Sequence, residues 1–136
     1  MLVTTRWFSY EPRIIYQKYG ETYNFQIFQH ALQEIRRYLW RTSDPVFVII
    51  DYTDVVKLTP FSMMRAGVLM ENTRPPNAVL GVAVARQGSK MYRYNAIWLR
   101  LGQAIGSKAA RDFHLTSTVG NAYQIILQHI AQTRST

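Results

Sequence analysis

Two carboxylates follow an apolar run near the middle of the chain. Residues 46–50 read VFVII, which predicts a strand buried on both faces, and Asp51 and Asp54 come soon after it. The carboxyl ends of strands are where α/β sheets place ligand sites, and paired acids there can hold Mg²⁺ or act as acid and base. The alternative is that Asp51 and Asp54 accept hydrogen bonds from backbone donors of the turn.

Two hydroxyl groups stand where the next helix is expected to begin. Thr59 precedes Pro60, a capping residue before proline at the first helical position, and this pair predicts a helix over residues 60–72. Thr59 or Ser62 could accept a phosphate, because the helix dipole favours negative charge at that end. The alternative is that Thr59 is only the cap and Ser62 only part of the first turn.

A basic loop joins the apolar run of residues 78–85 to the helix expected after it. Residues 86–93 read RQGSKMYR, and the candidate anion-binding groups are Arg86, Ser89, Lys90 and Arg93. Free backbone amides at a helix start suit an anion or an acidic partner. The loop has one glycine and lacks the spacing of a Walker loop, so it is not a nucleotide-binding fingerprint. A solvated basic loop is the alternative.

The helix expected over residues 89–106 holds more apolar residues than one covered face requires. One stripe at helical spacing consists of Met91, Tyr94, Trp98, Leu101 and Ile105. The excess predicts a second contact, either a dimer interface or a pocket for a hydrophobic ligand. The alternative is that neighbouring helices bury both sides.

The sequence carries no recognisable catalytic or metal-binding signature. His30, His114 and His129 lie far apart and lack the spacing of metal ligands, cysteine is absent, and no Gly-x-Ser-x-Gly motif occurs. We therefore expect a protein that is not an enzyme, with no catalytic residues, no metal and no cofactor.

Composition and charge narrow the class of protein. The chain has 136 residues, 48% of them hydrophobic and 18% charged, which fits one globular domain over residues 1–136. No apolar run is long enough to cross a bilayer, and no signal peptide or cysteine is visible, so we expect a cytoplasmic location. The net charge of +8 favours an acidic partner, but the basic residues are scattered, which disfavours nucleic acid.

The remaining segments predict an alternating order of strands and helices. Residues 4–10 and 13–19 indicate a hairpin around Glu11 and Pro12, and Asn24 caps a helix over residues 25–41. Further strands are expected at 46–50, 78–85 and 113–115, and a last helix over 118–132. The order is β-β-α-β-α-β-α-β-α, which predicts an α/β fold with a mixed central sheet, an N-terminal hairpin and covering helices.

Several short motifs carry a family resemblance over residues 13–130. They are Gly20 followed by Tyr23-Asn24, then Ala31-Leu32, VIID at 48–51, LTP at 58–60 and RPPN at 74–77. With the element order, they make the chain similar to the STAS domain of anti-sigma-factor antagonists and sulfate transporters, and more so to small stand-alone STAS-like bacterial proteins. The resemblance implies a STAS-like fold and a regulatory protein-interaction module, expected as a homodimer. The phosphorylatable Asp-Ser-Ser/Thr-Gly turn of the antagonists is replaced by TPFS at 59–62, so the resemblance does not extend to their kinase control.

Two further functions stay open beside the interaction module. Aromatic residues at Phe25, Phe28, Tyr94 and Trp98 favour a pocket for a small apolar or anionic ligand. Nucleic-acid binding rests on the net charge alone, and it would weaken steeply with salt.

Overall fold

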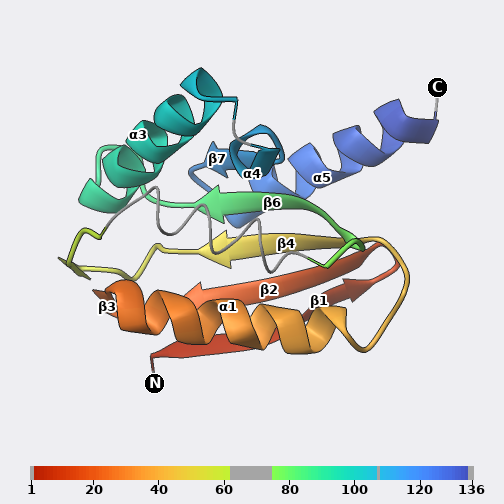
Figure 1. Cartoon of the computed structure of the whole chain (residues 1–136), viewed down its shortest axis with the longest axis horizontal. Helices are drawn as coiled ribbons and strands as arrows, with labels where there is room; N and C mark the ends of the chain where they lie inside the picture. The colour runs from red at the N-terminus through yellow and green to blue at the C-terminus, as the bar shows by residue number, and fades with distance from the viewer. Residues whose placement is uncertain (1, 62–74, 107, 135–136) are drawn as a thin grey trace.

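A mixed five-stranded sheet forms the centre of the molecule (Figure 1). In spatial order its strands are β1 (Val3–Tyr10), β2 (Arg13–Tyr19), β4 (Val46–Asp51), β6 (Ala78–Val84) and β7 (Phe113–Thr116). β1 runs antiparallel to β2, and every later pairing in this sheet is parallel. The computed structural model describes residues 2–61, 75–106 and 108–134. The predicted α/β class and mixed sheet are therefore confirmed.

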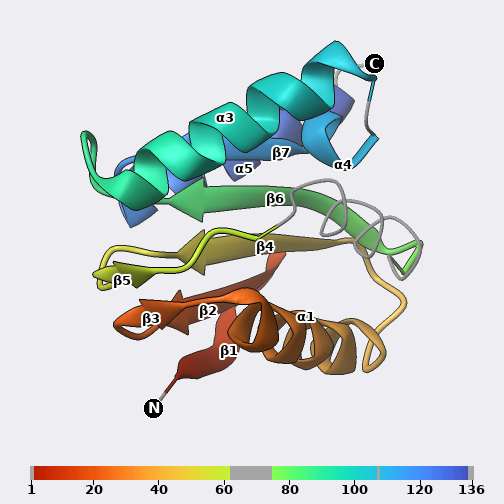
Figure 2. The same cartoon turned by 60° about the vertical axis from the view of Figure 1, so that its left-hand side comes forward.

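Helices cover both faces of this sheet (Figure 2). α1 (Phe25–Leu39) and α3 (Lys90–Ala104) pack on one face, and α5 (Val119–Arg134) packs on the other. A short helix, α4 (Lys108–Arg111), precedes β7. Side chains alternate between the two faces along each strand. Ile15 and Val48 therefore join the core under α1, whereas Ile14 and Ile49 join the core under α5.

The starts of α1 and α3 follow the expected capping residues. The Asn24 side chain accepts a hydrogen bond from the Ile27 amide at 2.9 Å, and Ser89 Oγ accepts one from the Tyr92 amide at 3.1 Å. Each contact satisfies a backbone donor that has no partner inside the helix. The sequence signals for these two helix starts are therefore confirmed.

Three features lie outside the expected order. β3 (Thr22–Tyr23) and β5 (Lys57–Leu58) form a small parallel pair, and α4 adds one helical turn. Elements of two to four residues are too short to show a periodic pattern in the sequence. The helix predicted over residues 60–72 falls almost wholly outside the described residues.

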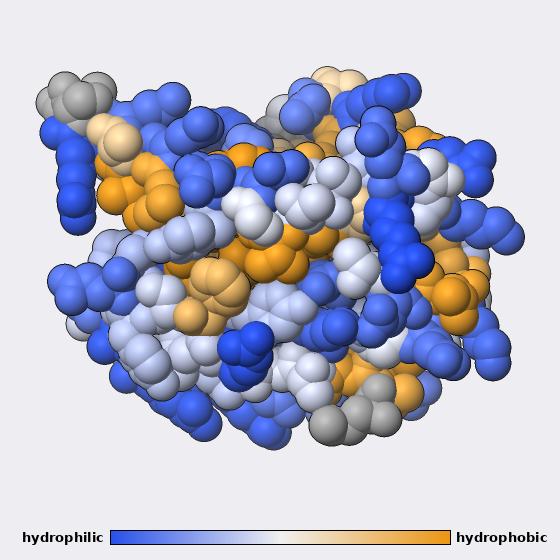
Figure 3. Space-filling model, turned by 180° about the vertical axis from the view of Figure 1, so that it is seen from behind, coloured by the Kyte–Doolittle hydropathy of each residue, from blue (hydrophilic) through white to orange (hydrophobic). Residues whose placement is uncertain are grey.

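The hairpin and α5 meet through aromatic rings on the far face of the sheet. Phe8 of β1 lies 5.6 Å from the ring of Tyr123 and 6.2 Å from that of Tyr16. Figure 3 shows the molecule from behind, with hydrophobic side chains in several patches, one of them in the middle, among hydrophilic ones. Within the described ranges, no helix combines the length and apolar content that crossing a bilayer requires.

Gly81 provides the first test of this packing. A Cβ at this position of β6 would come within 3.0 Å of the Phe113 ring, so Gly81→Ala must displace that ring. We expect a loss of about 1–3 kcal/mol in the free energy of unfolding, measured by urea denaturation.

Gly120→Ala is the matched control for Gly81→Ala. Gly120 lies in the first turn of α5, and a Cβ there would meet nothing within 4 Å. Alanine favours the helix over glycine by up to about 1 kcal/mol, so this variant should be slightly more stable. Equal stability changes in the two variants would contradict the close packing of Gly81 against Phe113.

Candidate functional site

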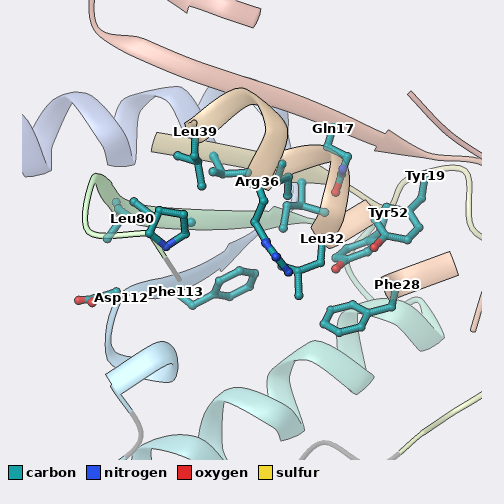
Figure 4. A pocket seen from close by; sticks show the side chains of 16 residues that line it. Gln17, Tyr19, Phe28, Leu32, Arg36, Leu39, Tyr52, Leu80, Asp112 and Phe113 are labelled. Atoms are coloured by element: carbon teal, nitrogen blue, oxygen red, sulfur yellow. The ribbon is translucent and has the colours of Figure 1, made fainter. Parts of the chain in front are cut away.

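An apolar cavity of about 110 Å³ lies over β2, β4 and β6, on the face of the sheet covered by α1 (Figure 4). Phe28 and Leu32 of α1 line one side, and Phe113 of β7 lines another. Val48 and Ile50 of β4 also line it, from the sheet. The sequence did not predict a cavity at this place, because its lining comes from segments far apart in the chain.

Gln17 contributes a buried polar group to the cavity. Its side chain is 1% exposed, and Nε2 donates to the Ala31 carbonyl at 2.8 Å and to Thr5 Oγ1 at 3.1 Å. The carbonyl of Ala31 can only accept, so it fixes which end of the amide faces α1. Gln17 Oε1 has no hydrogen-bond partner and belongs to a residue that lines the cavity. A buried acceptor without a donor costs free energy.

Arg36 adds a positive charge to the same cavity. Figure 4 shows its side chain reaching from α1 into the space among the labelled lining residues. The side chain is half-buried, and no acid in the described part of the chain forms an ion pair with it. Arg36 also lines an open groove beside Arg37 and Trp40.

Three buried tyrosines lie beside the cavity, and two of them line it. Tyr19, Tyr23 and Tyr52 have ring centroids 4.8–5.4 Å apart, and Tyr19 and Tyr52 line the cavity. Burial is the main cause that raises the pKa of each of the three hydroxyls. The three phenols therefore stay neutral at physiological pH.

A smaller cavity of about 40 Å³ lies next to these tyrosines, below α3. It shares Phe28, Tyr52 and Phe113 with the larger cavity and adds Tyr94 and Trp98. The aromatic residues that suggested a pocket from sequence therefore lie around these two cavities, with Phe25 packed behind them against Phe28.

The acidic turn after β4 is held by hydrogen bonds. Asp51 is buried, and it accepts from the Tyr16 hydroxyl, the Thr53 amide at 2.9 Å and the Thr53 hydroxyl at 2.7 Å. Burial and the Asp51 carboxylate raise the pKa of Tyr16. Asp54 is exposed and lies 3.2 Å from the ammonium of Lys18. The structure thus gives both carboxylates partners within the fold.

The candidate phosphate acceptors are only partly visible. Thr59 is exposed, and its amide donates to the Tyr23 carbonyl at 2.9 Å, which extends the pairing of β3 with β5. Ser62 lies outside the described residues. Phosphorylation at either position stays a prediction.

The basic loop before α3 is solvent-facing. The hydroxyl oxygen of Ser89 accepts a hydrogen bond from the Tyr92 amide. Arg86, Lys90 and Arg93 are exposed. Gly88 has φ +85°, a left-handed conformation that glycine adopts without a steric penalty. The loop therefore presents three cations to solvent, and anion binding there stays a prediction.

The apolar stripe of α3 divides along its length. Met91 is buried, and Tyr94 and Trp98 are half-buried, with the Trp98 ring 5.5 Å from that of Phe113. The two stripe residues nearer the C-terminal end are exposed, Leu101 to 55% and Ile105 to 73%. The first half of the stripe therefore belongs to the core and the second half to the surface.

Two of the three histidines interact although they are distant in sequence. His114 of β7 has a lowered pKa, first because of burial and then because of the charge of His129 on α5, while Asp112 opposes the shift. In the described ranges, no three His, Cys, Asp or Glu side chains gather as a metal-binding group.

Comparison with known proteins finds no relative of this chain. No family model, no curated protein and no solved structure matches this chain.

The hydrogen bonds of Asp51 lead to a stability test. Asp51→Ala should lower the free energy of unfolding by about 1–3 kcal/mol, because the half-buried Tyr16 hydroxyl and the Thr53 groups lose their acceptor. Asp54→Ala removes the same charge but only an exposed ion pair, which costs less than about 1 kcal/mol. Chemical denaturation of both variants measures the difference. Similar losses would show that Asp51 is not the structural member of the pair.

Proposed function

We propose that the chain is a regulatory protein-interaction module of STAS type, and that it contacts its partner through the C-terminal half of α3. We propose a function other than catalysis, because Asp51, the buried acid at the end of β4, already accepts hydrogen bonds from Tyr16 and Thr53. The element order and the motifs that resemble STAS domains support this class of function. A cytoplasmic location is part of the proposal.

The observation that carries the proposal is an exposed apolar stripe. Ile97 and Leu101 of α3 and its C-cap Ile105 are 49%, 55% and 73% exposed and recur every four residues. Residues at this spacing lie above one another on a single side of a helix. Covering such a stripe returns about 25 cal/mol per Å² of apolar surface removed from water, which favours association.

The charge around the stripe favours an acidic partner over a second copy. Arg93 and Arg100 are exposed on the same helix, and the whole chain has a net charge of +8. A second copy would bring the same arginines to the interface, and like charges there oppose association. We therefore propose that the stripe binds an acidic protein surface. A homodimer formed through the same stripe is the competing outcome.

Leu101→Glu tests the stripe directly. A carboxylate in the centre of an apolar contact must be desolvated, so affinity for a partner should fall by more than about tenfold. Gln103→Glu adds the same charge on an exposed position of the same helix and serves as the control. Each variant is used as bait against lysate of the native host, and affinities for the recovered protein are then measured by calorimetry.

The outcome separates three situations. Loss of one acidic protein in Leu101→Glu, with retention in Gln103→Glu, supports the proposal. A wild-type dimer in light scattering, dissociated by Leu101→Glu, would replace the acidic partner with a second copy. A folded Leu101→Glu protein that binds and assembles like the wild type would show that the stripe is not a contact surface.

A further inference from the structure

We infer that the end of α1 and the tip of the β1–β2 hairpin together form a binding track for single-stranded nucleic acid. The track combines arginine with aromatic side chains, and its main members are Trp7, Tyr10, Arg37, Tyr38, Trp40 and Arg41. It lies at the β1 edge of the sheet, whereas the exposed stripe of α3 lies at the β7 edge (Figure 2). The inference therefore does not depend on the proposed function.

A cationic groove lies on the outward face of α1. The described residues that line it are Gln33, Arg36, Arg37, Trp40 and Arg41, and none of these is an acid. Side chains three or four positions apart share one side of a helix, and α1 buries its other side against the sheet. The groove therefore opens away from the sheet, and its charge favours an anionic ligand.

Trp40 provides an open ring in this groove. It is the C-cap of α1 and is 78% exposed. In the described part of the chain, no other ring and no cation stacks on it. A nucleobase stacks on such a ring whatever its identity, because every base has a π-face.

The last carbonyls of α1 do not need the arginines beside Trp40. Basic side chains at the end of a helix often pair with its free carbonyls. Here the Arg36 carbonyl accepts a hydrogen bond from the Trp40 amide at 3.0 Å, and the Leu39 carbonyl accepts one from Asn77 Nδ2 at 3.0 Å. The helix end is thus closed by other donors, and the guanidinium groups remain for a ligand.

Two of these arginines are suited to bind phosphate. The Arg41 guanidinium lies 4.8 Å from the centre of the Tyr38 ring and forms no ion pair with any described acid. Stacking on a ring orients a guanidinium while the N–H groups at its edge can still donate. Arg37 lies 3.5 Å from a Glu34 carboxylate oxygen, but its side chain is 68% exposed. An exposed pair of this kind is weak, so a phosphate can compete for Arg37.

Ring contacts extend the track from α1 to the hairpin. The Tyr38 ring lies 5.4 Å from that of Trp7, which lies 5.8 Å from that of Tyr10. Arg13 lies over the Trp7 ring at 5.5 Å, with its Nε bonded to Asp44. Tyr10 is 69% exposed and is the second open ring of the track. Figure 1 shows the end of α1 and the hairpin at the same end of the molecule. The fold thus gathers cations and rings that are scattered along the sequence.

The composition of this surface favours nucleic acid over a membrane. A helix that lies in a membrane interface buries a broad apolar face. The exposed residues within α1 are instead all polar, namely Gln26, Gln29, His30, Gln33 and Arg37. Cations that meet the phosphates and rings that stack on the bases are the combination that binds single strands. A duplex hides the faces of its bases, so the exposed rings favour a single strand.

The test uses a fluorescently labelled oligothymidylate of about twelve nucleotides, a length within the range of single-strand sites. An abasic strand of the same length keeps the phosphates and lacks the bases. Fluorescence anisotropy with the whole chain should give an affinity about tenfold higher for oligothymidylate, because only this strand can stack on the rings. Both affinities should fall with increasing salt, because binding releases counterions from the phosphates.

Variants assign the bases and the phosphates. Trp40→Ala should weaken binding of oligothymidylate about tenfold and leave the abasic strand unaffected. Arg41→Gln should weaken binding of both strands, and the slope of log K against log salt should fall by about 0.7, as for one phosphate contact. Arg111→Gln removes an equal charge from an exposed position before β7 and should change either affinity less than about twofold. Thermal unfolding checks that each variant is folded.

The indole N–H signals of the three tryptophans locate the strand on the wild-type protein. On titration with oligothymidylate, the signals of Trp7 and Trp40 should move, while that of Trp98 on α3 should stay. Equal losses in Arg41→Gln and Arg111→Gln would mean that binding follows net charge alone and would overturn the inference. So would equal affinities for the two strands, absence of binding at low salt, or binding only to vesicles of phosphatidylserine and phosphatidylcholine.

Discussion

The parallel register between β2 and β4 determines where Gln17, Tyr16 and Asp51 lie. Ile15 pairs with Val48, Gln17 with Ile50 and Lys18 with Asp51. Because side chains alternate along a strand, this register places Gln17 beside Ile50 under α1 and Tyr16 on the opposite face near Asp51. If β2 shifted by one residue against β4, its side chains would change faces of the sheet. Lys18 would then lie under α1, and Tyr19 would leave its aromatic cluster.

The same register explains why one polar residue remains unsatisfied in the core. Gln17 is the only buried polar residue of β2, and α1 offers it the Ala31 carbonyl as an acceptor for its NH₂ group. Helical carbonyls are acceptors, so they cannot also satisfy Oε1. Gln17 Oε1 is therefore a buried acceptor without a donor.

Local signals in the sequence were sufficient for most of the fold. The cap at Asn24, the apolar run at 46–50 and the turn at Glu11-Pro12 each specify their element through neighbours in the chain, and the structure has α1, β4 and the hairpin there. Gln17 and Arg36 were not recognised as site residues. A glutamine between Tyr16 and Lys18 looks like the polar side of a strand, and only the packing of α1 reveals that it is buried.

The α3 stripe shows a second limit of sequence reasoning. Its excess of apolar residues predicts a second contact, and this stays a prediction; the spacing does not tell which end of the helix the core covers. The length of β7 decides this. β7 has four residues against fifteen in α3, and the last aromatic contact between the two elements is that of Trp98 with Phe113. Beyond that contact the helix continues past the short strand, and Leu101 and Ile105 remain exposed.

Phe113 lies between the cavity under α1 and helix α3. Its ring lines the cavity, lies against Gly81, and contacts Trp98 on α3. Protein interiors are close-packed, so a ring confined on these sides cannot move without displacing a neighbour.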